Sequence, residues 1–255
     1  MGAYSVHIAG LDKKNEPKQK TFREGADEMS AMAHGRGFTT KSVAPNPADI
    51  ETAVAHIAKD MNKDGEGTFL LTYTGHGAPE MICSTLPKGQ AWMLDEYVDY
   101  HELSIWRLLV GKFAKGIKVI VMSDSCYSTP LGYKDLKRSL LRAYMRRVGG
   151  VSGDELSQVL ADDGLEMLVE SLRLNVDVCA LTDKAPEPVC EYLHISAGEG
   201  LVTAAALTRA VCKVLADDPS PELTYEALEQ KLLLRINGID IMGPESLKQT
   251  AAFRP

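Results

Sequence analysis

Two apolar runs of the chain each end abruptly in a reactive side chain: LLTYTGHG at residues 70–77 and VIVMSDSC at residues 119–126. Aliphatic runs bounded by glycine or polar residues are typical of strands buried on both faces of a parallel sheet. In open parallel sheets the functional site lies outside the carboxyl ends of such strands. The sequence therefore predicts that two buried strands bring His76 and Cys126 to one edge of a sheet.

The combination of a cysteine with a histidine indicates nucleophilic catalysis. A free thiol is only a few per cent thiolate at neutral pH, and a neighbouring imidazole that takes its proton raises the supply of nucleophile. We expect Cys126 to attack a peptide carbonyl and His76 to protonate the leaving amine. The backbone N–H groups of Gly77 and Cys126 are candidates for the oxyanion hole. The competing interpretation is a small buried cysteine and a histidine in a turn.

Strand and helix patterns alternate along the chain, which is typical of a doubly wound α/β domain. Residues 4–9 and 38–43 have the pattern of strands, and helices are expected at 24–34 and about 101–114. A further helix is expected to begin at Pro47, since proline is favoured in the first turn. A chain of 255 residues, 45% of them apolar, can bury one large core.

Composition and net charge indicate which binding partners and which cellular compartment to expect. The formal net charge of −7 at pH 7 argues against nucleic acid as a partner and suits a basic peptide. The five cysteines show no paired spacing, so we expect reduced thiols in a cytoplasm. No run approaches the roughly 18 apolar residues of a membrane span, and the N-terminus lacks a signal-peptide pattern. A cytoplasmic protein without a membrane partner is expected.

No cofactor and no metal are expected. Residues 60–65, DMNKDG, begin like a calcium-binding loop, but the twelfth position is Leu71, where a bidentate glutamate is needed. A CxxC pair that would indicate zinc is lacking. The Gly-x-Ser-x-Gly elbow of serine hydrolases is lacking too.

The residues around both strand ends resemble caspase-like cysteine proteases, especially the metacaspases and their bacterial, orthocaspase-like relatives. The family's Ser-Gly-His-Gly corresponds to TGHG at residues 74–77, and its Asp-Ser-Cys-His-Ser-Gly to DSCYST at residues 124–129. Residues 193–198 and 200–207 resemble the family's next core strand and helix. His76 and Cys126 are 50 residues apart, the separation found between base and nucleophile in caspase-type proteases.

This resemblance implies the three-layer caspase-like (caspase-hemoglobinase) fold, a mostly parallel sheet with helices on both faces. It implies a single peptidase domain over residues 1–255, with a helical insertion at about 130–189. It also implies a cysteine endopeptidase that cleaves protein or peptide substrates after arginine or lysine through a Cys126–His76 dyad.

The resemblance also implies which residues set the specificity. Asp124, two residues before the nucleophile, would pair with the arginine or lysine of the substrate. Thr74 corresponds to a second pocket position. The family's other pocket aspartate corresponds to Gly25 here, and Asp27 or Glu24 would substitute for it. The competing interpretation of Asp124 is a loop residue bound to local amides.

Two positions depart from the family pattern, with Tyr127 in place of histidine and Thr129 in place of glycine. They leave open a catalytically inactive caspase-fold protein that binds peptides or partner proteins. Within the insertion, Arg147 is a candidate for self-cleavage because the glycines that follow it extend easily into a cleft. The competing interpretation of the insertion is two solvated helices.

Overall fold

The computed structural model describes residues 2–80, 89–95, 99–101, 105, 108–109, 112–126, 190–197, 203–236 and 238–254. The predicted insertion at about 130–189 lies outside these residues, as do Tyr127, Thr129 and Arg147. No helix in the described part of the chain is long and apolar enough to cross a membrane.

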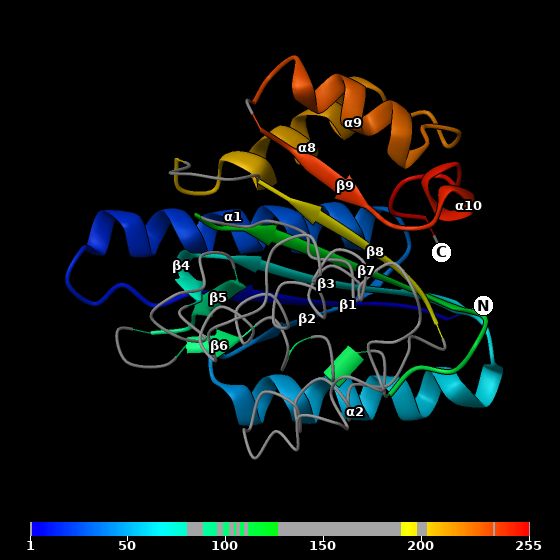
Figure 1. Ribbon diagram of the computed structural model, residues 1–255, viewed down its shortest axis with the longest axis horizontal. Helices are drawn as coiled ribbons and strands as arrows, with labels where there is room; N and C mark the ends of the chain where they lie inside the picture. Colours follow the sequence, from blue (N-terminus) through cyan, green and yellow to red (C-terminus); the bar gives the residue numbers. More distant parts are fainter. Residues whose placement is uncertain are drawn as a thin grey trace, which may run out of the picture.

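A six-stranded sheet forms the middle layer, in the order β2-β1-β3-β7-β8-β9 (Figure 1). The first five strands in this order are parallel, and β9 pairs antiparallel with β8. Almost every residue of the central strands β3 and β7 is buried, which explains their continuous apolar sequences. The strands are β1 (Gly2–Ala9), β2 (Thr39–Val43), β3 (Gly67–Thr74), β7 (Ile117–Asp124), β8 (Glu191–Ser196) and β9 (Asp240–Met242).

Helices cover both faces of this sheet. In Figure 1, α2 lies along one face, and α1, α8 and α9 lie on the other. Alternate residues of β3 face the two cores: Leu70 packs in the core under α1 and α8, whereas Phe69 and Leu71 pack in the core under α2. The helices are α1 (Glu16–Gly35), α2 (Pro47–Asp64), α8 (Ala206–Asp217), α9 (Tyr225–Leu233) and α10 (Glu245–Lys248).

Side-chain caps fix where the first two helices begin. The α2 helix begins at Pro47 as expected, after Asn46, whose side chain accepts from the Asp49 N–H. The α1 helix begins at Glu16 and not at residue 24, because the Asn15 side chain caps it and Pro17 fits its first turn. The helix expected at about 101–114 is present at residues 105, 108 and 109, but residue 101 itself ends a strand.

A second, small sheet continues from the end of β3. It consists of three antiparallel strands, β4 (His76–Glu80), β5 (Gly89–Met93) and β6 (Asp99–His101). Figure 1 shows it at the end of the large sheet toward which β1 and β3 run. His76 is therefore the first residue after the turn from one sheet to the other. The predicted architecture, a mostly parallel sheet with helices on both faces, is confirmed.

Candidate active site

The histidine and cysteine segments meet at the carboxyl ends of β3 and β7. Thr74 lies opposite Asp124 in the parallel register, and the Gly75 N–H donates to the Asp124 carbonyl oxygen at 3.2 Å. Beyond the strand ends, a Cβ on Gly77 would lie only 2.0 Å from the carbonyl oxygen of Cys126. The two backbones thus touch, and any side chain at position 77 would force them apart.

The glycine before His76 has a different neighbour. A Cβ on Gly75 would lie 2.3 Å from Tyr73 Oη, and a Cβ on Gly10 would lie 2.7 Å from the same oxygen. This hydroxyl lies 2.8 Å from the His76 carbonyl oxygen and 2.7 Å from that of Met93, and can donate to either. The Tyr73 ring stacks on Trp92 with 4.7 Å between centroids. Tyr73 therefore anchors the backbone at His76, and the glycines leave room for its hydroxyl.

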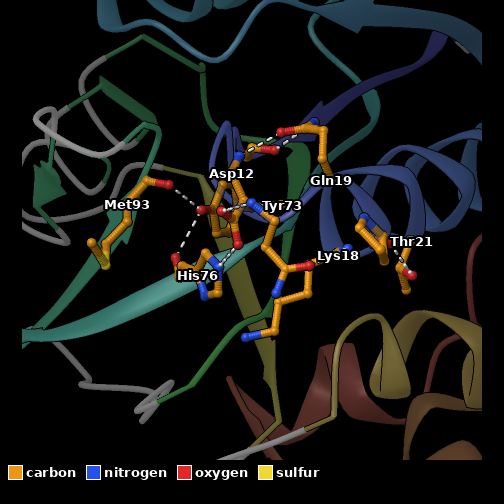
Figure 2. Close-up of polar contacts among 10 residues, drawn as sticks. Asp12, Lys18, Gln19, Thr21, Tyr73, His76 and Met93 are labelled. Carbon is orange, nitrogen blue, oxygen red and sulfur yellow. Dashed lines mark hydrogen bonds and ion pairs between the residues drawn. The ribbon is translucent and has the colours of Figure 1, made fainter.

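The His76 imidazole is held by two residues that precede it in the chain. Its Nε2 lies 2.8 Å from Asp12 Oδ2, and its ring meets that of Phe22 edge-on, with 5.0 Å between centroids. The side chain of His76 is 33% exposed and that of Asp12 only 12% exposed. Figure 2 shows the carboxylate of Asp12 pointing at the imidazole. The ring is thus fixed on one side and open to solvent on another.

Asp12 is itself fixed by the loop between β1 and α1. Its Oδ1 accepts from the Asn15 N–H at 2.9 Å, and its own N–H donates to the Gln19 side chain, which also bonds the Gly10 carbonyl oxygen. The hydrogen bond to His76 lowers the pKa of Asp12, so this carboxyl is ionised at neutral pH. Asp12 is not among the site residues that the sequence predicts. Its position just after the first predicted strand was the available signal, but nothing in the sequence places β1 beside β3.

Asp124 lies inside the protein, with 1% of its surface exposed. Its Oδ2 accepts from the backbone N–H of Thr208, in the first turn of α8, at 2.8 Å. Its Oδ1 has no hydrogen-bond partner among the described residues. Burial raises the pKa of Asp124 to about 6. Asp124 thus caps α8 with one carboxyl oxygen, while the other has no hydrogen-bond partner in the part of the chain that the structure describes.

The other predicted pocket residues lie in different surroundings. Thr74 is fully buried beside Asp124, and its Oγ1 lies 3.1 Å from Thr208 Oγ1. Gly25 packs against α8, where a Cβ would lie 2.9 Å from that of Ala205. An aspartate at position 25 therefore has no room. Asp27 is exposed on α1, outside the buried pair formed by Asp124 and Thr74.

Cys126 is half-buried at the end of the cysteine segment. Three residues earlier, hydrogen bonds hold Ser123 near the end of β7: Trp92 Nε1 donates to Ser123 Oγ at 3.1 Å, and His194 Nε2 lies 2.9 Å from the same oxygen. Burial lowers the pKa of His194 to about 4, so this imidazole is neutral at pH 7. No cluster of three or more potential metal ligands occurs within the described ranges.

No family model matches the chain, and no curated protein matches it. Its structure is similar to that of protein GSU0716 from Geobacter sulfurreducens, with a TM-score of 0.62, 19% sequence identity, and 100% of this chain and 99% of that chain covered. Caspase-1 from Spodoptera frugiperda gives a TM-score of 0.48 at 11% identity, over 94% of this chain and 85% of that chain. A structure of pro-sf-caspase-1 gives a TM-score of 0.45 at 11% identity, over 94% of this chain and 86% of that chain. The similarity to the Geobacter protein concerns the fold alone.

Proposed function

We propose that the protein is a cysteine endopeptidase of the caspase and metacaspase type, with Cys126 as nucleophile and His76 as proton carrier. The observation that carries this proposal is the junction of β3 and β7. The two segments meet at the carboxyl edge of the sheet, where β3 and β7 pair in parallel register. Two further contacts join them there: the Gly75–Asp124 hydrogen bond and the close approach of the Gly77 and Cys126 backbones. That edge is where α/β proteins bind ligands.

The proposed reaction uses the thiol and the imidazole in turn. His76 takes the thiol proton, and the Cys126 sulfur forms a bond to the carbonyl carbon of the scissile peptide. The C–N bond then breaks, and the protonated imidazole gives its proton to the departing amine. Water then attacks the resulting thioester while His76 accepts one of its protons. The C–S bond breaks, the carboxylic acid is released, and the imidazolium returns the proton to the sulfur, which restores the thiol. The N–H groups of Gly77 and Cys126 stay the proposed donors to the oxyanion.

Specificity for arginine or lysine is proposed to come from Asp124. The Oδ1 atom of its buried carboxyl lacks a hydrogen-bond partner in the described part of the chain. A guanidinium or ammonium group of the substrate would supply a donor. Because Asp124 is buried, substrate binding has to uncover this oxygen. Thr74 would line the same pocket. Asp27 stays a proposed substrate-binding residue, and because its side chain is exposed it could contact more distant parts of a basic substrate.

Turnover of short reporter peptides tests the function. The wild type should hydrolyse peptides ending in arginine or lysine and leave aspartyl peptides intact. Cys126→Ala should abolish turnover, and His76→Ala should lower kcat about 10²- to 10⁴-fold. The matched control is Cys212→Ala, which removes another half-buried thiol, on α8, and should leave kcat unchanged. Wild-type protein that binds these peptides without cleaving them would instead support an inactive binding module.

A further inference from the structure

We infer that Asp12 is a positioning residue that selects the Nε2–H tautomer of His76 and so makes Nδ1 the nitrogen that exchanges protons during catalysis. The catalytic role of Nδ1 rests on the proposed function, whereas the tautomer does not. The inference starts from the 2.8 Å contact between His76 Nε2 and Asp12 Oδ2 (Figure 2).

The chemistry of the two groups decides where the proton lies. An ionised carboxylate can only accept hydrogen bonds, and a neutral imidazole carries a proton on one nitrogen only. The pKa of Asp12 is lowered, chiefly by the hydrogen bond to His76, so Asp12 presents an acceptor at neutral pH. The nitrogen facing it must therefore be the N–H donor. This leaves the lone pair of the neutral ring on Nδ1.

The surroundings of Asp12 prevent it from turning away. Oδ1 is occupied by the Asn15 N–H, and the Asp12 backbone N–H is bound by the side chain of Gln19. A largely shielded carboxylate with both oxygens engaged is a preorganised partner, comparable to the groups that orient catalytic histidines in other nucleophilic enzymes. The ring is also held edge-on by Phe22, which limits its rotation.

The same surroundings predict an unusual effect of an isosteric change. In Asp12→Asn, the Asn15 N–H still requires an acceptor, so the amide oxygen of the new side chain takes the place of Oδ1. The amide NH₂ then faces His76 and becomes a donor. Nε2 must accept, which moves the ring proton to Nδ1. The substitution should therefore invert the tautomer and occupy the nitrogen needed for proton transfer, while it preserves the shape of the site.

The test combines an NMR measurement with kinetics on the full chain. In histidine-¹⁵N-labelled protein, at a pH where the ring is neutral, the His76 signals should show the Nε2–H form in the wild type and the Nδ1–H form in Asp12→Asn. The His76 signals are assigned among the six histidines by comparison with His76→Gln. For an arginyl reporter, Asp12→Asn should lower kcat at least about 10²-fold with KM within about twofold.

Asp60→Asn provides the matched control. Asp60 also forms a charged hydrogen bond, to Lys63 at 2.7 Å, but near the end of α2 that leads into the start of β3, at the opposite edge of the sheet. This variant should keep both the tautomer and kcat. An Nδ1–H ring in the wild type, an unchanged tautomer in Asp12→Asn, or an unchanged kcat would overturn the inference. Wild-type protein that has the Nε2–H ring and no peptidase activity would refute the proposed function and leave the tautomer assignment supported.

Discussion

At the scale of residues, the two acidic side chains near the site differ in their partners and in the direction in which their pKa values are shifted. Asp12 is bound by a histidine and a backbone N–H, and its pKa is lowered. Asp124 is buried with one oxygen bound and the other unpartnered in the described structure, and its pKa is raised to about 6. In the second case desolvation raises the pKa and outweighs the opposing hydrogen bonds of Thr208 and Leu207 and the charge of Arg209. A cationic substrate would pair with the oxygen that has no partner among the described residues, which makes binding depend on pH.

This difference predicts how the preference for arginine varies with pH. Below about pH 6 Asp124 becomes protonated and cannot pair with a guanidinium, so the preference should weaken as the pH falls. The measurement is the ratio of kcat/KM for reporters ending in arginine and in citrulline, its neutral isostere, between pH 7.5 and 5. The ratio cancels titrations that affect both substrates equally.

Asp124→Asn provides the comparison for this profile. It keeps an acceptor for the Thr208 N–H but removes the charge, so the ratio should be low at all pH values, by at least about 30-fold at pH 7.5. If the wild-type ratio is independent of pH, or if Asp124→Asn keeps the wild-type ratio, Asp124 only caps α8 and does not recognise the substrate.

At the scale of elements, the sequence predicted the two strands that carry the site because their apolar runs are continuous and end abruptly. Strands β3 and β7 lie at the centre of the sheet, where both faces are buried. The start of α1 differs from the predicted residue 24 because the first turn and a half of this helix, residues 16–21, are mostly polar and show no apolar periodicity. The contact between Asp124 and α8 spans 84 residues of sequence. No local pattern reports such a contact.

The same limit applies to the residues around His76. The glycines on either side of it were apparent in the sequence, but their reasons are tertiary: Gly75 faces the Tyr73 hydroxyl and Gly77 faces the Cys126 carbonyl. Likewise, the family's pocket aspartate has no counterpart at Gly25 because that helix position packs against Ala205. The sequence indicates which residues are reactive, whereas their partners depend on how the strands are ordered.

At the scale of the whole molecule, two buried histidines make the fold sensitive to acid. His7 lies between Thr72 Oγ1 at 2.8 Å and Ser5 Oγ at 2.9 Å, and His194 bonds Ser123. Burial lowers the pKa of each to about 4. Because the folded-state pKa lies below the unfolded value near 6.5, the unfolded chain binds more protons in this range. Their stabilisation is present above pH 6.5 and is lost as the pH falls toward 4.

Each buried histidine should contribute up to about 3 kcal/mol to this loss. Asp124, with its raised pKa, acts in the opposite direction, but the two histidines outweigh it. Urea unfolding at pH 7 and 4.5 measures the decline in the free energy of unfolding, and His7→Gln should reduce this decline substantially. His56→Gln, at a side chain that is 78% exposed, is the control and should keep the wild-type decline. An equal decline in His7→Gln and the wild type would show that His7 does not couple folding to pH.

The central claim concerns the whole molecule as well, since it states that two distant segments form one reactive site. Intact-mass analysis after treatment with a peptidyl-arginine chloromethyl ketone tests it most directly. The account predicts one adduct per chain, located on Cys126 among the five cysteines, and strongly slowed labelling in His76→Ala. An aspartyl analogue at equal concentration should leave the mass unchanged. Labelling spread over several cysteines, or labelling of Cys126 at the same rate with and without His76, would contradict the account.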